Sequence, residues 1–300
     1  MRKSADRAGW GTGSHVEPLL RVLVRTPSAE GDFAAAGWRS PDAGLLLREH
    51  EQFVSLLRSL GCEVVVAPAV PGLVDACYTH DPVVMTPAGA VIVQMRKAVR
   101  VSEPKLLYAE LQRLGVPILG ALTGEAYMDG GDKVWLDEQT LLIGRGYRTN
   151  AAAIAQMRAL VQPLGVRVEV FDLPHHRGPD EVLHLMSVVS PLARDLVAVF
   201  EPLAPVALME LLQAHGVKRV PIAEEELATQ GGNILAVAPR VVVVPSGNPV
   251  TVAALRAAGC DVHEFDAANI CVKGDGGPTC LTQPLLRAPC SDPAQEGRSA

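Results

Sequence analysis

The sequence predicts an α/β fold in which five units, each a β-hairpin followed by a helix and a third strand, close into a ring. Three observations predict this fold. An apolar, helix-periodic stretch that ends at a glycine and leads into a β-rich run occurs five times. Paired β-rich runs precede four of these helices, and the two runs that would form the fifth hairpin lie near opposite ends of the chain. A repeat of about fifty residues therefore organises most of the sequence.

The five predicted helices all end in the same way. In each, a glycine stands where a helix C-cap needs a residue in the left-handed conformation, and a strand follows at once. The helix ends with their following strands span 56–68, 110–120, 159–171, 210–222 and 253–265, and the capping glycines are Gly61, Gly115, Gly165, Gly216 and Gly259.

Two β-rich runs separated by a turn are predicted to form a hairpin before each helix. Four hairpins span 81–95, 133–146, 183–200 and 233–247. The run 279–286 has no partner downstream, whereas the run 21–27 has none upstream. Pairing these two runs supplies the fifth hairpin and closes the ring, which also reduces the unpaired edges of the sheets.

Ring closure predicts one domain over residues 18–287. The segments 1–17 and 288–300 are rich in Gly, Ser, Pro and charge without periodicity, and we predict disordered tails there. No stretch approaches the roughly 18 apolar residues of a membrane span, and the N-terminus lacks the apolar segment of a secretory signal. These features predict a cytoplasmic protein with no membrane partner.

The composition favours small-molecule chemistry. A net charge of −6 without a run of lysines or arginines gives no electrostatic footprint for nucleic acid. The six cysteines form no CxxC pair, and no HExxH spacing occurs, so we expect neither a disulfide framework nor a metal site. Cys62 and Cys260 are predicted core residues, whereas the roles of Cys77, Cys271 and Cys290 and the oligomeric state stay open.

Polar residues mark the point where the chain enters each hairpin. They are Asp81, the segment 129–132, His184, Asn233 and Cys280. Since the five units face one axis, residues about fifty positions apart would meet in one pocket. Asp, Asn and Gly also favour turns, so the pattern has a purely structural interpretation as well.

Cys280 and His184 are the candidates for covalent chemistry. Cys280 follows a Gly-Gly-Pro-Thr turn whose backbone N–H groups can face a developing charge, a setting typical of a nucleophile. An isolated cysteine can equally be a small buried hydrophobe. His184 lies among apolar residues, where it would be either a hydrogen-bonded core residue or a general acid/base.

Two pairs of carboxylates indicate a cationic ligand. "DACYTHDP" contains Asp75 and Asp81, and "YMDGGDKVWL" contains Asp129 and Asp132. Carboxylates that point into a pocket need a positive partner, and a planar guanidinium matches paired carboxylates best. A thiol beside a bound guanidinium implies attack on its central carbon.

The segments "YTHDP", "YMDGGD", "RTN", "LHLMS" and "GGPTCLTQPL", in this order, resemble the guanidino-modifying superfamily of dimethylargininases, arginine deiminases and amidinotransferases. The resemblance covers 21–287 and is greatest to the dimethylargininases. It implies a five-bladed, pseudo-symmetric α/β propeller and cysteine-based substitution at a guanidinium carbon without a cofactor. Within the catalytic set, Cys280 resembles the nucleophile, His184 the acid/base and Asp129 the conserved carboxylate.

The resemblance also implies contacts with a free guanidino amino acid. Asp81 would hold the guanidinium with Asp75 and Asp132 nearby, and two arginines would receive the α-carboxylate. A loop at 25–37 matches the family's mobile lid. The remaining substrate-binding candidates are Arg100, Arg148 and, in the lid, Phe33.

The implied reaction hydrolyses an N-methylated arginine to citrulline and an amine through an S-alkylthiouronium intermediate. Asp129 stands where hydrolase relatives commonly have Glu and amidinotransferases tend to have Asp, so arginine deiminase and amidinotransferase activities remain alternatives. A propeller of this kind can also bind ribosomes without catalysis. Such a protein would not need a cysteine, a histidine and a carboxylate at the ring centre.

Overall fold

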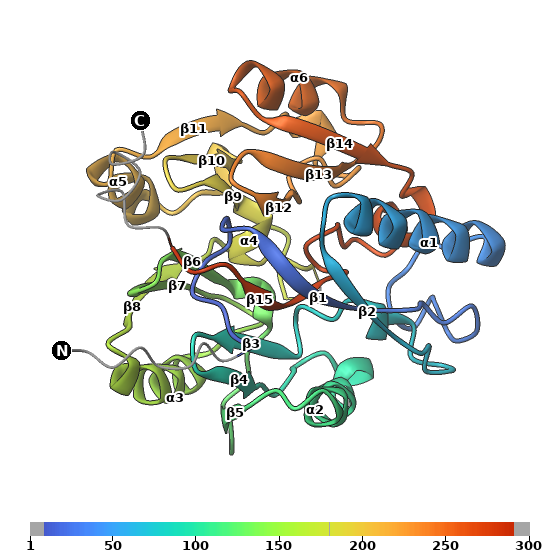
Figure 1. Cartoon of the computed structure of the whole chain (residues 1–300), viewed down its shortest axis with the longest axis horizontal. Helices are drawn as coiled ribbons and strands as arrows, with labels where there is room; N and C mark the ends of the chain where they lie inside the picture. Colours follow the sequence, from blue (N-terminus) through green and yellow to red (C-terminus); the bar gives the residue numbers. More distant parts are fainter. Residues whose placement is uncertain (1–8, 180, 291–300) are drawn as a thin grey trace.

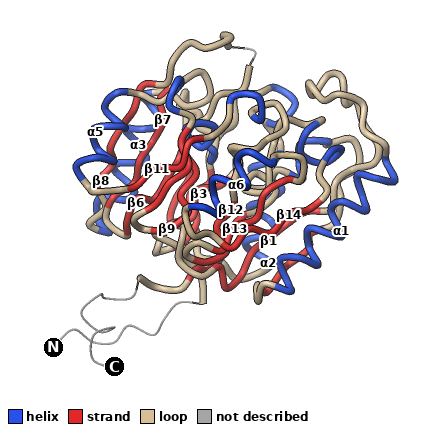
Figure 2. The backbone as a smooth tube through the Cα atoms, turned by 90° about the horizontal axis from the view of Figure 1, so that it is seen from above, coloured by secondary structure: helices blue, strands red, loops and turns tan. Residues whose placement is uncertain are grey.

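Five sheets of three strands each form the β-structure of the computed structural model, which describes residues 9–179 and 181–290. In every sheet the middle strand pairs antiparallel with the first strand of its hairpin and parallel with the strand that follows the helix. The sheets are arranged around a common centre, and the five long helices lie at the periphery (Figure 1). Turned by 90°, the strands run through the middle of the molecule with helices outside them (Figure 2).

The elements follow the predicted order. The hairpins are β15 (Gln283–Arg287) with β1 (Leu19–Arg25), β3 (Val83–Thr86) with β4 (Gly89–Ile92), β6 (Lys133–Asp137) with β7 (Thr140–Arg145), β9 (Val189–Ala193) with β10 (Leu196–Val199), and β12 (Leu235–Ala238) with β13 (Val241–Pro245). The helices that follow are α1 (Ala43–Ser59), α2 (Glu103–Arg113), α3 (Ala151–Val161), α5 (Val206–Ala214) and α6 (Pro249–Ala257). The third strands are β2 (Glu63–Ala67), β5 (Ile118–Ala121), β8 (Arg167–Asp172), β11 (Lys218–Pro221) and β14 (Asp261–Phe265).

The ring closes through the two ends of the chain. β1 pairs antiparallel with β15, with Val22 opposite Pro284 and Leu23 opposite Gln283. Every sheet therefore has the same three-stranded order, and none is left with an incomplete hairpin. The predicted five-bladed α/β propeller is confirmed.

The helix ends also follow the prediction. All five capping glycines have positive φ, between 65° and 90°, which an L-residue with a side chain adopts only at a cost. At the opposite end of α3, the side chain of Asn150 accepts a hydrogen bond from Ala153 N at 2.9 Å and caps the helix. None of the helices in the described ranges is long and apolar enough to cross a bilayer.

Two predicted hairpins begin later than the sequence pattern indicates. The run 183–200 starts with a short helix, α4 (Leu185–Val188), before β9 begins. The run 279–286 starts with a turn in which Thr282 N donates to Thr279 O at 3.1 Å, and β15 begins only at Gln283. His184, the N-cap residue of α4, and Cys280, which lies on a turn, therefore precede the first strand of their sheets.

The N-terminal segment differs from the predicted disordered tail. Within the described part, Gly11 N donates to Leu285 O at 2.8 Å, Thr12 N donates to Thr86 O at 3.1 Å, and His15 is buried. The segment is ordered because it supplies partners to strand ends that would otherwise be unsatisfied. The described start of the C-terminal segment is also ordered, since Ala288 N donates to Pro18 O. The rest of both predicted tails, 1–8 and 291–300, lies outside the described residues.

The apolar core is divided into five clusters, each shared by neighbouring sheets. Val84 of β3 clusters with Leu141 of β7, for example, and Val134 of β6 clusters with Val197 of β10. Because these clusters fill the space between sheets, they provide the burial that stabilises the fold. Polar side chains can then occupy the centre of the ring.

Candidate active site

A cavity of about 1100 Å³ lies at the centre of the ring, where the hairpin entrances meet. Its wall includes Asp81, Gly131, His184, Asn233 and Cys280, which precede β3, β6, β9, β12 and β15. Each of the five units thus contributes one of its entrance residues. The structure brings these positions together as the repeat predicts.

Cys280 is held in this wall by Asn233 of the neighbouring unit. Asn233 Nδ2 donates to Cys280 Sγ at 3.2 Å, and Asn233 Oδ1 accepts from Thr279 N at 3.0 Å. Gly277 permits the approach, since a Cβ there would lie 2.3 Å from Asn233 Cγ. Burial and the Asp81 carboxylate raise the pKa of the Cys280 thiol to about 11. The partly exposed sulfur is therefore a neutral thiol in the free protein.

His184 is paired with a fully buried carboxylate. Its Nε2 lies 3.1 Å from Asp129 Oδ2, and Asp129 has no exposed surface. Burial alone would lower the pKa of His184, but the carboxylates of Asp132, Asp129 and Asp81 raise it above its ordinary value. The raised pKa favours the protonated imidazole, which suits a general acid. Gly131 leaves room for the ring, because a Cβ there would lie 2.4 Å from His184 Nδ1.

Asp132 binds the backbone next to His184. Its Oδ2 accepts from Thr149 Oγ1 at 2.6 Å and its Oδ1 accepts from Leu185 N at 2.9 Å. Asp132 is fully buried and is not part of the cavity wall. The sequence predicted a substrate contact here, whereas the structure uses both oxygens to fix the backbone beside His184. Burial raises the pKa of Asp132 to about 6.

Arg148 contacts the same carboxylate oxygen of Asp129 as His184 does. Its Nε donates to Asp129 Oδ2 at 2.8 Å, and its side chain lines the cavity. Within the described residues, neither terminal nitrogen of Arg148 makes a hydrogen bond, so this edge of the guanidinium faces no internal partner. Burial would raise the pKa of Asp129, but the hydrogen bond from His184 and the Arg148 charge keep it below its ordinary value. Asp129 therefore stays ionised and orients His184.

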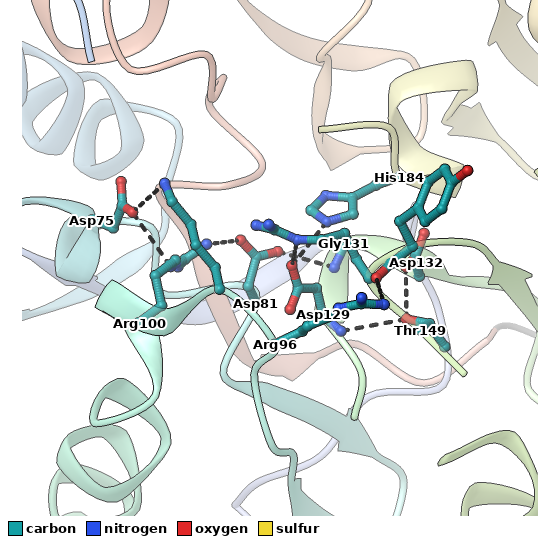
Figure 3. A network of polar contacts seen from close by, with 12 residues as sticks. Asp75, Asp81, Arg96, Arg100, Asp129, Gly131, Asp132, Thr149 and His184 are labelled. Atoms are coloured by element: carbon teal, nitrogen blue, oxygen red, sulfur yellow. Dashed lines mark hydrogen bonds and ion pairs between the residues drawn. The ribbon is translucent and has the colours of Figure 1, made fainter. Parts of the chain in front are cut away.

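Asp81 already holds a guanidinium from within the chain. Its Oδ2 accepts from Arg100 Nη1 at 2.6 Å, and its Oδ1 accepts from Gly131 N at 3.0 Å (Figure 3). Burial would raise the pKa of Asp81, yet Arg100 and protonated His184 hold it well below its usual range. Because each oxygen has a second lone pair, Asp81 can still accept from a ligand.

Arg100 lies deeper than the predicted carboxylate-binding role requires. It is 3% exposed, and besides Asp81 it pairs with Glu103 at 2.8 Å and donates to Tyr78 O at 3.1 Å. Glu103 follows three residues later at the start of α2, so the helix fixes this pair. Arg100 thus neutralises carboxylates at the base of the cavity.

Asp75 fastens the loop that was predicted to be a lid. Its Oδ1 accepts from Trp38 Nε1 at 2.7 Å and its Oδ2 accepts from Lys97 Nζ, also at 2.7 Å. Lys97 Nζ in turn donates to Ala36 O at 2.6 Å, which ties the loop to the cavity wall. No motif in the sequence singles out Trp38 or Lys97, because their partners lie far away along the chain.

The predicted cover, Phe33, does not line the cavity. Its ring packs edge-on against Trp38, with the centroids 5.7 Å apart, and Phe33 is not part of the wall. The backbone of 34–37 lines the cavity instead. Small residues therefore form this side of the opening.

The remaining cysteines lie apart from this chemistry. Cys62, Cys77, Cys260 and Cys271 are buried, and all six cysteines of the chain are free thiols. Burial raises the pKa of Cys62 to about 11. In the described part of the chain, no group of three or more His, Cys, Asp or Glu side chains is placed to hold a metal ion.

The family model for arginine deiminase matches residues 69–216 and 203–287. The chain belongs to this family. Among curated proteins it is similar to an N(G),N(G)-dimethylarginine dimethylaminohydrolase of Streptomyces coelicolor, 28% identical over 273 residues that cover 88% of this chain and 96% of the relative. It is 24% identical to an arginine deiminase of Listeria welshimeri, over 70% of this chain and 61% of that enzyme.

Solved structures share the fold across nearly the whole chain. A mutant DDAH from Pseudomonas aeruginosa complexed with citrulline has a TM-score of 0.73 at 22% identity, covering 90% of this chain and 100% of that one. SxtG, an amidinotransferase from Microseira wollei, has a TM-score of 0.77 at 16% identity, covering 95% and 99%. The fold is therefore that of the guanidino-modifying superfamily. Family and curated relative together make the protein a hydrolase acting on carbon–nitrogen bonds in linear amidines.

Proposed function

We propose that the protein hydrolyses an N-methylated L-arginine, or a close analogue, to citrulline and an amine through covalent attack by Cys280. One observation carries the proposal: a thiol, a histidine hydrogen-bonded to a buried carboxylate, and Asp81, which already pairs with a guanidinium, share one cavity. The Streptomyces coelicolor relative, a dimethylarginine dimethylaminohydrolase, supports this substrate class.

The bound cation activates the thiol. In the free protein Cys280 keeps its proton, because burial and Asp81 raise its pKa to about 11. A guanidinium placed against Asp81 neutralises that carboxylate and brings a positive charge to the sulfur, which lowers the thiol pKa. The proton leaves to solvent, since His184 already carries one. Substrate binding therefore generates the nucleophile.

His184 then serves first as acid and later as base. The thiolate forms a bond to the guanidinium carbon, and the C–N bond to the methylated nitrogen breaks as His184 donates its proton to that nitrogen. A neutral amine departs and a cationic S-alkylthiouronium remains on Cys280. Water, deprotonated by the now neutral His184, attacks the same carbon. Cleavage of the C–S bond releases citrulline and restores the thiol, while Asp129 keeps the imidazole oriented.

The first test is turnover of a panel of arginine, N-methylarginines and other guanidino compounds, with citrulline and each amine measured by mass spectrometry. Citrulline with methylamine or dimethylamine is the expected result. Ammonia from plain arginine would move the activity to deimination, and transfer to added glycine or lysine would move it to amidino transfer. The proposal fails if no guanidino compound changes.

The Cys280→Ser variant tests the nucleophile. It should reduce turnover by at least about a thousandfold, because a serine hydroxyl is a far weaker nucleophile at this position. The thermal melting curve should stay close to that of the original protein. Cys260→Ser is the matched control, since this thiol is buried away from the cavity, and it should retain turnover. Undiminished turnover in Cys280→Ser would exclude covalent catalysis by this residue.

A further inference from the structure

The turn that leads into Cys280 contains glycines that lie against two aromatic rings. A Cβ on Gly274 would overlap Tyr78 Oη and would lie 2.5 Å from Trp38 Cζ2. A Cβ on Gly276 would lie 2.7 Å from the Tyr78 ring. Neither glycine has a φ in the left-handed region, so glycine is required here by the lack of space. The backbone of the turn is therefore in direct contact with the two rings.

Trp38 and Tyr78 form one buried stack. Their ring centroids lie 5.4 Å apart with 20° between the planes, and both residues are buried. Trp38 Nε1 donates to Asp75 Oδ1 at 2.7 Å. Tyr78 Oη donates to Ile270 O at 2.9 Å. Stacking, together with one hydrogen bond on each side chain, fixes the surface that the glycines contact.

The backbone next to Trp38 is bonded to the same turn. Arg39 N donates to Lys273 O at 2.9 Å, and the Arg39 guanidinium pairs with Asp275 at 2.9 Å. Lys273 and Asp275 are the neighbours of Gly274 in the sequence. The segment that carries Trp38 is thus bonded to both sides of the glycine that its ring contacts.

The position of the glycine turn affects the Cys280 sulfur in two ways. Gly277 O accepts from Leu281 N at 3.2 Å, so one turn of backbone encloses Cys280. Against the burial that raises the pKa of the Cys280 thiol, the backbone N–H of Gly277 lowers it. A displacement of the turn would therefore move both the sulfur and the N–H that favours the thiolate.

We infer that Trp38 is a positioning residue for the nucleophile: with Tyr78 it forms the surface that holds the glycine turn, and this turn places the Cys280 sulfur. The inference rests on the proposed function for the role of Cys280. Trp38 does not line the cavity, so it acts on the reacting atom through the turn and not on the substrate. Loss of its ring should weaken the chemical step more than substrate binding.

The test removes the ring of Trp38 and measures Cys280 directly, with peptide mass mapping to follow this thiol. In Trp38→Leu, iodoacetamide alkylation of Cys280 at about pH 9 should slow about three- to tenfold, because a displaced Gly277 N–H no longer favours the thiolate. With a guanidino compound that is turned over, kcat should fall about threefold or more, and KM should change less than about twofold. Trp38→Phe keeps an aromatic ring against Tyr78 and should recover most of both losses.

Gly276→Ala disturbs the same contact from the other side. Its Cβ would lie 2.7 Å from the Tyr78 ring, while both aromatic side chains are retained, so this variant should also slow alkylation and lower kcat. It tests the contact even if Trp38→Leu does not fold. The two substitutions together should have less than the product of their separate effects, because both act on one contact.

Trp135→Leu is the matched control, since this buried tryptophan belongs to another apolar cluster and its Nε1 donates to Met85 O at 3.2 Å. It should lower the melting temperature while leaving Cys280 alkylation and kcat nearly unchanged. The inference fails if Trp38→Leu changes these two rates no more than Trp135→Leu does, or if it raises only KM.

The two readouts separate this inference from the proposed function. Slower alkylation in Trp38→Leu, in a protein that turns over no guanidino compound, would refute the proposed hydrolysis and leave the positioning role standing. Turnover with unchanged alkylation and kcat in Trp38→Leu would refute the positioning role and leave the hydrolysis standing.

Discussion

At the scale of single residues, Asn233 of a neighbouring unit affects both the position and the pKa of the Cys280 thiol. One side of its amide fixes Thr279 N and the other donates to Cys280 Sγ. A hydrogen bond donated to sulfur favours the thiolate, so it opposes the burial and the Asp81 charge that raise the thiol pKa. Asn233 therefore both places the sulfur and limits the rise of its pKa.

Asn233→Ala should shift the ionisation of Cys280 upward. The rate of alkylation by iodoacetamide at this thiol should rise with pH toward a midpoint near 11, and the variant should move that midpoint up by up to about one pH unit. Peptide mass mapping identifies the alkylation of Cys280 separately from the other thiols. Asn233→Asp keeps the Thr279 contact but adds negative charge, so it should shift the midpoint at least as far. An unmoved midpoint in both variants would contradict this role.

For single residues, the residue type and the place in the repeat predicted where a side chain lies better than they predicted which residues it contacts. Cys280, His184 and Asp81 could be identified because each begins a hairpin and carries chemistry that a turn does not need. The burial of Arg100 and Asp132 could not be predicted, since it depends on Asp81 and Thr149, which are distant along the chain and contact them only in the folded protein.

At the scale of helices and strands, the candidate catalytic residues lie just before the strands. The start of helix α3 forms hydrogen bonds to one of these segments. Asn150 illustrates the connection. It caps α3 through Ala153 N, and the same Oδ1 lies 3.3 Å from Tyr127 N while Nδ2 donates to Glu125 O. The helix start is thus bonded to the loop that leads directly into Asp129.

Asn150→Ala should lower the free energy of unfolding by about 1–2 kcal/mol, because the cap and two loop bonds are lost together. Chemical denaturation measures this change. Turnover should fall as well, since the loop before Asp129 loses its anchor. Asn150→Asp retains the capping oxygen and should recover most of the stability. Asp42→Ala removes the corresponding cap of α1, far from Asp129, and should reduce stability without lowering kcat. Equal effects of the two Ala variants on kcat would contradict the connection.

The elements themselves were largely predictable, and their exact starts were not. Helix periodicity ending at glycine is a local signal, and each of the five predicted positions carries positive φ. The starts of β9 and β15 depend instead on Leu185 N bonding to Asp132 and on the turn around Cys280. Asp132 belongs to another unit than Leu185, and Asn233 of a neighbouring unit binds Thr279 N in the turn before β15, so a local pattern contains neither contact.

For the molecule as a whole, folding buries a lysine beside two histidines that come from distant parts of the chain. Lys133, the first residue of β6, is buried between His80 and His15, with Nζ 2.9 Å and 3.4 Å from their Nε2 atoms. Trp135 N donates to His15 Nδ1, so a neutral His15 carries its proton on Nε2, facing the lysine. Only an uncharged amine has a lone pair to accept that proton. The N-terminal segment that supplies His15 was predicted to be disordered because its composition reveals nothing of this partner.

The remaining bonds agree with a neutral Lys133. His80 Nδ1 lies 2.9 Å from Thr282 O, which can only accept, so His80 carries its proton on Nδ1. The lone pair on His80 Nε2 can then accept an N–H from the Lys133 amine. Burial and the nearby Arg287 lower the pKa of Lys133 to about 7, against a smaller opposing effect of Asp81. The pKa of His80 falls to about 3, chiefly through burial, and that of His15 is also lowered. The contacts and the lowered pKa values thus agree on an uncharged amine between two neutral imidazoles.

Stability should therefore depend on pH through Lys133. Between about pH 7 and pH 10 the unfolded chain holds a proton on this lysine that the folded chain has released, so the free energy of unfolding rises with pH in that window. The full contribution is up to about 5 kcal/mol, reduced by any residual structure in the unfolded chain. Lys133→Met removes it. Chemical denaturation at several pH values should show the stability of the original protein, relative to Lys133→Met, rising across the window. Lys105→Met, on the exposed face of α2, should show no such trend. A pH-independent difference for Lys133→Met would mean that the folded protein keeps this lysine charged. It would contradict the uncharged amine inferred from the hydrogen bonds with His15 and His80.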